Sequence, residues 1–310
     1  MTRIAVLGTL VGIGLLTMTV AAFQQPAAGQ APAMVVQVDK LKDNLYVMRG
    51  GGGNSAVFVT ATGVVVVDTK NPGWGAPLLA QIRSVTDKPV TVIINTHTHG
   101  DHVSGNVEFP ANVEVVAHVN TAENMKAMRA VATIPQNAPP RNIFNEHGGV
   151  GLPKRTFLDS LTLGTGADRI ELRYFGRGHT NGDAWVVFPA LRVAHAGDIF
   201  SGKNLPLLDS NNGGSAVDIG PSLEKAATAL GSQVDSFITG HSAVMTLADL
   251  REYAQFNKDF ASDVIAAKKA GTSVDEIAKT WKIPAKYVGY GAPNEARLRG
   301  NVDLVFNETR

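Results

Sequence analysis

The sequence of 310 residues contains no cysteine. Disulfide bonds and lipid attachment at a cysteine are therefore excluded, and no thiolate is available to bind a metal. Aromatic residues are also scarce, at 6% of the chain, whereas glycine occurs 32 times. This composition suits a sheet-rich fold with many tight loops.

The chain also lacks an excess of charge of either sign, with 28 basic and 27 acidic residues. A net charge of +1 implies neither nucleic acid nor an anionic membrane surface as a partner, and we expect a small-molecule substrate instead. No repeat at the spacing of solenoid proteins occurs in the sequence. Residues 34–310 are enough for one α/β domain with a substantial core, but they do not indicate the oligomeric state.

The first 33 residues have the form of a secretory signal peptide followed by a short tail. An apolar run at residues 4–23 precedes a stretch rich in small residues, glutamine and proline, with possible cleavage ends at 27–29 and 31–33. We therefore expect a periplasmic or secreted protein without stable membrane association after cleavage. The alternative is an uncleaved anchor, because the apolar run is about as long as a membrane span.

The most informative segment is the run Thr-His-Thr-His-Gly-Asp-His at residues 96–102. It follows an apolar stretch, residues 90–94, that we expect to be a buried parallel strand. The C-terminal ends of such strands are where α/β sheets usually carry their chemistry. Within six residues the run offers imidazole and carboxylate ligands suited to Zn²⁺: His97, His99, Asp101 and His102. A histidine-rich surface loop is the alternative, but it would need no partners elsewhere in the chain.

Such partners are present at the ends of three later apolar stretches. Each is a ligand-type residue with a glycine directly beside it: His179, Asp198 and His241. Glycine permits the close backbone approach that a metal-binding loop needs. Any one of the three could be a buried structural residue, but their recurrence at strand ends favours a single site. The other histidines, His118, His147 and His195, match no such pattern and are expected to be structural.

In this order, the ligand-type residues resemble those of the metallo-β-lactamase-fold hydrolases over residues 35–250. The segments at residues 63–69, 176–183 and 197–200 are similar to the same family. The resemblance implies an α/β fold, a four-layer αββα sandwich, and two metal ions. It assigns His97, His99 and His179 to the first ion, Asp101, His102 and His241 to the second, and Asp198 to a bridge between them.

The chemistry implied by the resemblance is hydrolysis with two Zn²⁺ ions. Three neutral imidazoles leave zinc an open position for water, whose pKa metal binding can lower to about 7. A second ion then shares the resulting hydroxide and polarises the carbonyl that it attacks. Asp101 is the candidate catalytic residue, because a carboxylate beside the water can orient it and pass a proton to the leaving group.

One departure from the family bears on the substrate. The zinc β-lactamases most similar around residues 176–200 have a cysteine where this chain has Asp198, whereas a bridging aspartate is typical of glyoxalase II-type thioesterases and lactonases. We therefore expect an exported dinuclear zinc hydrolase acting on an ester, lactone, thioester or amide. β-Lactam hydrolysis is the first alternative. An iron-dependent redox enzyme of the same fold is the second, because histidine and carboxylate also suit Fe(II). A non-catalytic metal-binding or sensing role stays open as well.

Two strand-rich halves are expected around this site. Apolar stretches predict strands in the first half at residues 34–38, 45–48, 56–60, 64–68 and 90–94, with a helix at 77–85. Asn120 with Glu123 predicts a capping box that opens a helix reaching about residue 131. The second half is expected to have strands near residues 155–158, 169–175, 184–188 and 192–195.

The C-terminal part, from about residue 246, is predicted to be helical within the same domain. Thr246 and Asp249 can cap a helix that ends at Gly271, and Ser273 with Glu276 opens a shorter one ending near residue 281. Its helices are expected to pack against the sandwich, with a contribution to a substrate pocket or a dimer contact as the alternative.

Several residues near the motifs are expected to support the site. Asp68 ends a four-valine stretch and is predicted to hydrogen-bond the metal loop. The polar residues that follow His179, at 180, 181 and 183, are expected either to do the same or to form a turn. Residues 200–221 are the best candidate for substrate contacts, and residues 50–54 are expected to form a flexible loop.

Overall fold

The computed structural model describes residues 34–309 except 133 and 135–140. The predicted signal segment, residues 1–33, lies outside the described residues. From Met34 onward the chain forms one compact unit. No helix in the described part combines the length and the apolar composition needed to cross a membrane.

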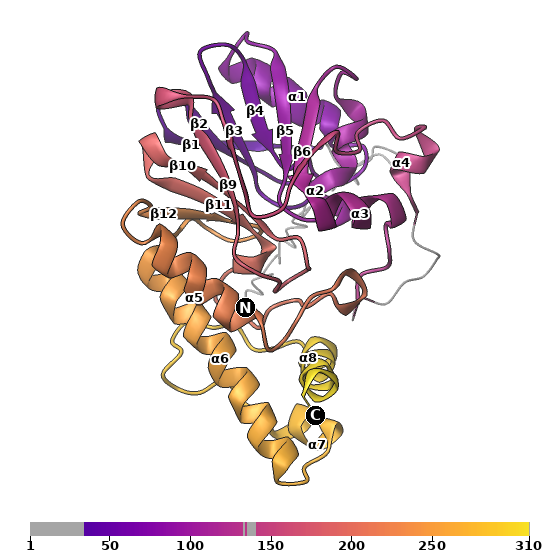
Figure 1. Ribbon diagram of the computed structural model, residues 1–310, viewed down its shortest axis with the longest axis vertical. Coiled ribbons are helices and arrows are strands. Elements are labelled where there is room, and N and C mark those ends of the chain that lie inside the picture. The colour runs from indigo at the N-terminus through magenta and orange to yellow at the C-terminus, as the bar shows by residue number, and fades with distance from the viewer. Residues whose placement is uncertain (1–33, 133, 135–140, 310) are drawn as a thin grey trace, which may run out of the picture. The chain divides into compact units, whose positions relative to one another are not determined.

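The first sheet has seven strands in sequence order (Figure 1). The first four pair antiparallel, and the next three continue the sheet in parallel. The bounds are β1 Gln37–Lys42, β2 Leu45–Arg49, β3 Ser55–Val59, β4 Val64–Val67, β5 Val90–Asn95, β6 Glu114–His118 and β7 Arg155–Phe157. Helix α1, Gly75–Val85, makes the crossover between the parallel strands β4 and β5.

The second sheet has six strands in the order β13-β12-β11-β10-β9-β8. Its only parallel pair is β11 with β12, and helix α5, Ile219–Leu230, connects these two strands. The bounds are β8 Ser160–Leu163, β9 Ile170–Tyr174, β10 Ala184–Phe188, β11 Val193–Gly197, β12 Ser236–Thr239 and β13 Met245–Thr246.

The two sheets pack face to face between outer helices, as Figure 1 shows. Side chains such as Val67 and Ile94 from the first sheet meet Val186 and Ile238 from the second in one buried apolar cluster. Helix α1 packs on the outer face of the first sheet, and α5 with α6, Leu247–Lys269, packs on that of the second. The predicted four-layer αββα sandwich is therefore confirmed. Strand β4 is buried on both faces, which is why it reads as four consecutive valines.

The C-terminal helices follow the predicted caps, with one addition. Thr246 and Asp249 form the capping box of α6, and Ser273 caps α7, Val274–Thr280. A further helix, α8, Glu295–Glu308, was not predicted. It packs against α6 and α7 and buries residues spaced by three and four: Leu298, Asn301, Val302 and Val305. A buried asparagine among only three apolar residues weakens the sequence signal for this helix.

Helix α3, Val119–Ala127, differs from the prediction at both ends. Its N-cap is His118, whose Nδ1 accepts a hydrogen bond from the backbone N–H of Asn120, so the predicted capping box at Asn120 was wrong. The helix ends before Met128, which has a left-handed φ of 42°, and not near residue 131. The first strand also begins at Gln37, later than predicted, and residues 155–157 form β7 of the first sheet and not a strand of the second half as predicted. Strands β6, β8 and β13 were not predicted.

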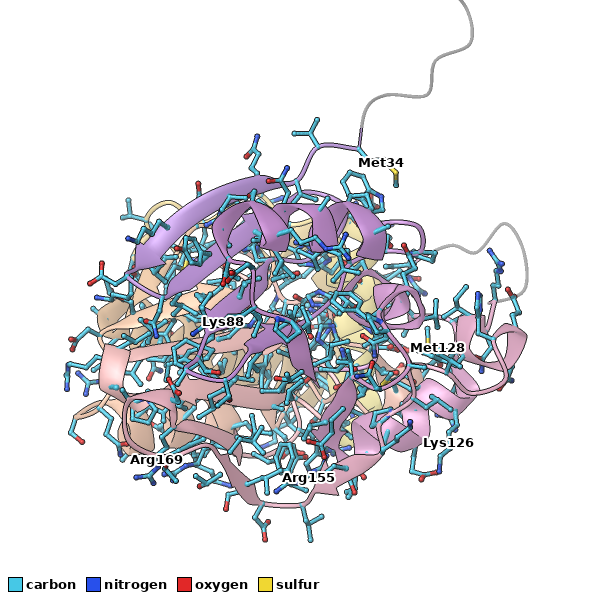
Figure 2. The ribbon with its side chains drawn as sticks, turned by 90° about the horizontal axis from the view of Figure 1, so that it is seen from above. Met34, Lys88, Lys126, Met128, Arg155 and Arg169 are labelled. Carbon is cyan, nitrogen blue, oxygen red and sulfur yellow. The ribbon has the colours of Figure 1, made fainter. Side chains whose placement is uncertain are left out.

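Short helical turns complete the described structure. Two are single α-helical turns, α2 Gly100–Val103 and α4 Ile143–Glu146. The 3₁₀ turns are Ser104–Glu108, Gly166–Asp168, Pro189–Leu191, Asp198–Phe200 and Ser210–Asn212. Figure 2 shows charged side chains such as Lys126 and Arg169 at the rim of the structure. There they form ion pairs with Glu123 and Glu171 respectively, so the positive charge at each position is balanced by a neighbouring carboxylate.

Candidate metal centre

All seven predicted ligand residues meet at one edge of the sandwich, beyond the ends of four strands. His97 and His99 lie on the loop after β5, and Asp101 and His102 lie in the short helix α2 that follows. The other three follow strands of the second half: His179 after β9, Asp198 after β11 and His241 after β12. Parallel strands that end at the same edge explain why residues so distant in sequence converge.

Glycines bring the loops close together at this edge. Gly197 has a φ of 57°, and a Cβ there would lie 2.6 Å from Thr96 Oγ1. A Cβ at Gly240 would overlap Asp198 Oδ1. The glycines beside Asp198 and His241 are therefore needed for close approach, as the sequence indicated.

The first ligand group consists of His97, His99 and His179, and all three residues are buried. His99 Nδ1 and His179 Nε2 are 3.0 Å apart. Asp198 Oδ2 lies 3.7 Å from His179 Nε2 and 4.0 Å from His97 Nε2. One ligand atom from each of these four residues lies within 4.8 Å of the other three, which is close enough for the four atoms to surround one metal ion.

The second ligand group consists of Asp101, His102 and His241. His241 Nε2 lies 3.2 Å from Asp101 Oδ2 and 3.3 Å from His102 Nε2. Asp198 again completes the set, with Oδ1 3.2 Å from His102 Nε2 and Oδ2 3.2 Å from His241 Nε2. Asp198 therefore lies between the two groups and is placed to contact ions in both.

Asp68 and Thr96 fix the orientation of two of these imidazoles. Asp68 accepts hydrogen bonds from the backbone N–H and the hydroxyl of Thr96, at 2.8 and 2.7 Å, and lies 2.7 Å from His102 Nδ1. Thr96 Oγ1 gives its one proton to Asp68, so it accepts the proton of His97 Nδ1, 2.9 Å away. His97 and His102 must then present Nε2 as an unprotonated lone pair when neutral. The prediction that Asp68 supports the metal loop is confirmed.

Asp209 and Leu207 orient the other two histidines. His99 Nε2 lies 2.8 Å from Asp209 Oδ2, and His179 Nδ1 lies 2.6 Å from the carbonyl oxygen of Leu207. Both partners accept a proton: the one from Leu207 is a carbonyl oxygen, and Asp209 is a carboxylate whose pKa burial would raise but hydrogen bonds to His99, Ala132 and Asn212 together keep below its usual value. The lone pairs of His99 Nδ1 and His179 Nε2 therefore point into the first group. Neither Asp209 nor Thr96 was identified from the sequence.

This arrangement fits bound cations. His97 Nε2 is buried and has no hydrogen-bond partner in the described part of the chain, and the lone pairs of His99 and His179 face each other. Such buried, unpaired acceptors are costly unless a cation sits between them. Burial lowers the pKa of His97 far below its usual value and that of His179 to about 4, which keeps both in the neutral form that binds metal.

In the second group, nearby opposite charges and hydrogen bonds favour the charged forms of His241 and Asp198. Burial would lower the pKa of His241, but hydrogen bonds to Asp101 and Asp198 raise it to about 9. Burial would also raise the pKa of Asp198, but the charge of His102 and the hydrogen bonds to His102 and His241 together hold it well below its usual value. The carboxylates are thus ionised and available as ligands.

The remaining polar candidates lie outside the ligand groups. Asp183 accepts hydrogen bonds from the backbone and hydroxyl of Thr180, which forms the turn that carries His179. His195 contacts Asn54 and Gly197, as expected for a structural histidine. His118 stacks on Tyr174, and His147 contacts the carbonyl of Ile143.

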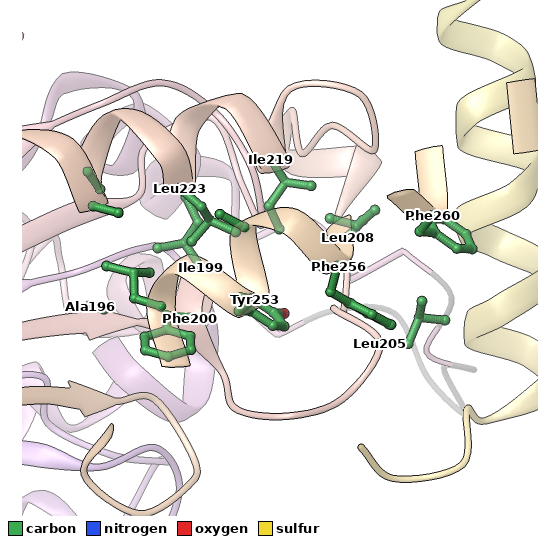
Figure 3. Packing of buried hydrophobic residues seen from close by; sticks show 14 of the residues in the cluster. Ala196, Ile199, Phe200, Leu205, Leu208, Ile219, Leu223, Tyr253, Phe256 and Phe260 are labelled. Atoms are coloured by element: carbon green, nitrogen blue, oxygen red, sulfur yellow. The ribbon is translucent and has the colours of Figure 1, made fainter. Parts of the chain in front are cut away.

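A cavity of about 540 Å³ opens over both ligand groups. Part of its wall comes from Ser201, Asn204 and Leu207, which lie within residues 200–221, the segment predicted to contact the substrate. Figure 3 shows how this loop is anchored: Ile199, Phe200, Leu205 and Leu208 pack in one apolar cluster with α5 and α6. Arg297 of α8 also lines the cavity, although no sequence pattern pointed to it.

Residues 50–54, expected to form a flexible loop, are instead held by hydrogen bonds to residues outside the segment. Lys70 Nζ donates to the carbonyl oxygens of Met48 and Gly53, and burial lowers the pKa of this lysine to about 7. Asn54 donates from its backbone to Gly240 and from its side chain to Thr239. The segment thus supports the loop of His241 and does not line the cavity among the described residues.

Comparison with known proteins agrees with this site. The model of the metallo-beta-lactamase superfamily matches residues 48–241, which contain all seven ligand residues. The chain belongs to this superfamily. Superfamily members are generally hydrolases, and the described cluster of histidines and aspartates is a possible metal site in this one.

Two curated relatives are similar in sequence. The metallo-beta-lactamase type 2 of Elizabethkingia meningoseptica is 27% identical over 179 residues, 53% of this chain and 62% of the relative. The 2,4-dinitroanisole O-demethylase subunit alpha of Nocardioides sp. (strain JS1661) is 25% identical over 262 residues, 83% of this chain and 73% of the relative. The chain thus spans less than two thirds of the length of the lactamase relative.

Two solved structures share the fold. The metallo-beta-lactamase from Pontibacter korlensis matches with a TM-score of 0.58 at 18% identity, over 73% of this chain and all of that one. The sec-alkylsulfatase Pisa1 from Pseudomonas sp. matches with a TM-score of 0.68 at 17% identity, over 89% of this chain but only 50% of its own. The second match covers so much of this chain that it must include part of the C-terminal helices.

Proposed function

We propose that the protein is an exported hydrolase that uses two zinc ions to attack the carbonyl group of an ester, lactone, thioester or amide. The observation that carries the proposal is the convergence of four imidazole ring nitrogens, on His97, His99, His102 and His179, around the carboxylate of Asp198. The first ligand group with Asp198 would hold one ion, and the second group with Asp198 the other. Bound zinc would supply activated water and polarise the bond under attack.

Asp101 is the residue best placed to handle the proton of the reaction. Its side chain is 30% exposed and lines the cavity, whereas Asp198 is 9% exposed and lies between the two groups. Oδ2 of Asp101 contacts His241, so its other oxygen can accept a hydrogen bond from water in the cavity. Asp101 would orient that water and carry its proton to the leaving group.

Export rests on the sequence of residues 1–33 alone, which supports a periplasmic or secreted location. The absence of excess charge supports a small molecule over nucleic acid as the partner. Neither point affects the chemistry of the site.

The test is metal analysis combined with a substrate panel. We expect close to two zinc ions per chain, activity on at least one ester, lactone, thioester or amide, loss of activity on chelation, and recovery on adding zinc. A single ion under metal-replete conditions would contradict the proposal. Iron in the active protein would instead support the redox alternative.

β-Lactam hydrolysis is the second candidate, favoured by the 27% identity to the lactamase of E. meningoseptica. The residue at 198 is an aspartate, and we expect the surrounding loops to set specificity. Asp198→Cys should therefore gain no carbapenem hydrolysis, measured as kcat/KM beside a lactone and a thioester. A large rise for the carbapenem alone would show that residue 198 limits lactam hydrolysis. Because of the O-demethylase relative, an aryl methyl ether belongs in the same panel.

A further inference from the structure

The cavity over the ligand groups is lined by both apolar and polar side chains. Besides the ligand residues it is lined by apolar side chains, including Val131 and Leu207, and by the polar side chains of Ser201, Asn204 and Arg297. The arginine is the only lysine or arginine among the described residues that line this cavity. A small molecule that reaches the ligand groups therefore shares the cavity with a guanidinium group.

Helix α8 holds Arg297 at this position. Its backbone N–H donates to the cap residue Asn294, and its Nη1 donates to the carbonyl oxygen of Leu205 at 3.3 Å. One helical turn later, the buried Asn301 donates to the carbonyl oxygen of Pro206 at 2.9 Å. Arg297 and Asn301 lie four residues apart on one helix face, so this face of α8 runs along the loop that forms the cavity wall. The guanidinium is thus fixed by a rigid element.

Arg297 lacks the carboxylate partner that neighbouring cations have. Among the described residues, no carboxylate oxygen lies within 4.0 Å of its guanidinium, whereas Lys203 pairs with Asp249 and Glu252. On the same helix, Arg299 pairs with Asp275 at 2.9 Å. A half-buried guanidinium without a counterion favours a bound anion, because its planar donors match an oxyanion.

Asn204 adds a second free donor. Its Oδ1 accepts a hydrogen bond from Ser201 Oγ at 3.3 Å, and its amide nitrogen has no acceptor in the described part of the chain. Both Asn204 and Arg297 line the cavity, so their donors can serve one bound group.

We propose that Arg297, assisted by Asn204, binds an oxyanion carried by the substrate, away from the bond that is hydrolysed. The preferred substrates are then small hydrolysable compounds with an anionic end and an apolar segment that contacts Val131 and Leu207. This inference rests on the proposed hydrolase function, and it assigns C-terminal helix α8 a role in substrate selection.

The experiment compares two esters that differ only in the end of the acyl chain. Zinc-loaded protein is assayed with para-nitrophenyl valerate and with the para-nitrophenyl half-ester of glutaric acid, which adds a carboxylate. The variants are Arg297→Met, Arg297→Lys and, as matched control on the same helix, Arg299→Met. Thermal denaturation of each variant reports whether the loop contact with Leu205 matters for stability.

We expect wild type to prefer the anionic ester by about tenfold or more in kcat/KM, the size expected for a hydrogen-bonded charge pair. Arg297→Met should lose this preference through a higher KM for the anionic ester, whereas the neutral ester, which offers the guanidinium no oxyanion, should lose far less. Arg297→Lys should keep part of the preference, and Arg299→Met all of it. Equal kcat/KM for both esters in wild type, or an equal loss on both in Arg297→Met, would overturn the proposal.

A binding measurement separates this inference from the proposed function. Calorimetry on the zinc-loaded proteins compares levulinate, a keto acid, with methyl propyl ketone, which lacks the carboxylate. Levulinate affinity should fall about tenfold in Arg297→Met and stay unchanged in Arg299→Met. If levulinate binds in this way but no ester, lactone, thioester or amide is hydrolysed, the hydrolase proposal fails and the oxyanion site stands. If the affinity is the same in all variants, the carboxylate binds elsewhere and the oxyanion site fails.

Discussion

The two ligand groups rest on different supports. The first group is buried, and two of its histidines are oriented by Asp209 and Leu207, which belong to the loop that α8 contacts. In the second group, Asp68 at the end of β4 contacts His102 directly, whereas it reaches His97 of the first group only through Thr96, and the side chain of His241 is 43% exposed. The cavity reaches both groups, but the histidines of the first are all buried whereas the second includes the exposed His241, so we expect the first to hold its ion more tightly.

The largest expected effect comes from removing a ligand of the enclosed group. His179→Ala should abolish ion binding at the first group and lower hydrolysis by about a hundredfold or more, because the nucleophile depends on the bound ions. The measurement is kcat/KM on the best substrate found, with metal content determined on the same sample.

His195→Ala is the control for this variant. His195 is equally buried, but among the described residues it hydrogen-bonds Asn54 and Gly197 and none of the predicted ligand residues, so hydrolysis should fall far less. An equal loss in both variants, with the fold intact by circular dichroism, would remove the distinction between ligand and structural histidines.

An intermediate effect should separate the two supports. Asp209→Asn should weaken zinc at the first group by about ten- to a hundredfold and leave the second little changed, because Asp209 orients His99. Asp68→Asn should weaken zinc at the second group by the same factor, through His102, and at the first group by less, because Asp68 reaches His97 only through Thr96. Competition with a chromophoric chelator measures both affinities. If either variant weakened both ions equally, the groups would share one support and the comparison would fail.

The smallest effect concerns the contact between α8 and the loop. Asn301→Ala removes the hydrogen bond to Pro206 and should lower the free energy of unfolding by about 1 kcal/mol. It should also weaken zinc at the first group by a few-fold and leave the second unchanged. Urea denaturation and the same chelator competition test this, with Asn307→Ala on the exposed side of α8 as control. No difference between the two variants would show that α8 does not support the first group.

The sequence was sufficient to bring the seven candidate ligand residues to one edge of the sandwich, because four lie in one run after an apolar strand and three directly follow a glycine after a later one. Asp68 was found for the same reason, since it ends a buried strand. The supports Asp209 and Thr96 were missed because their role depends on tertiary contacts that no spacing records. Arg297 was missed for the same reason, together with the helix that carries it.

The errors in the elements also have local causes. Asn120 with Glu123 looked like a capping box, but the imidazole of His118 accepts a hydrogen bond from the backbone N–H of Asn120. His118 is therefore the N-cap, and α3 begins at Val119. Residues 50–54 are rich in glycine and looked flexible, but Lys70 and Asn54 fix them through backbone carbonyls. In both cases a side chain outside the predicted segment, His118 or Lys70, makes the hydrogen bond that sets the local structure.

The most direct test of the account is a zinc titration of metal-free protein by calorimetry, with wild type, His179→Ala and His241→Ala. The account predicts two binding events of unequal affinity in wild type, loss of the tighter event in His179→Ala, and loss of the weaker one in His241→Ala. A single event in wild type, or loss of the same event in both variants, would contradict the existence of two separate metal sites.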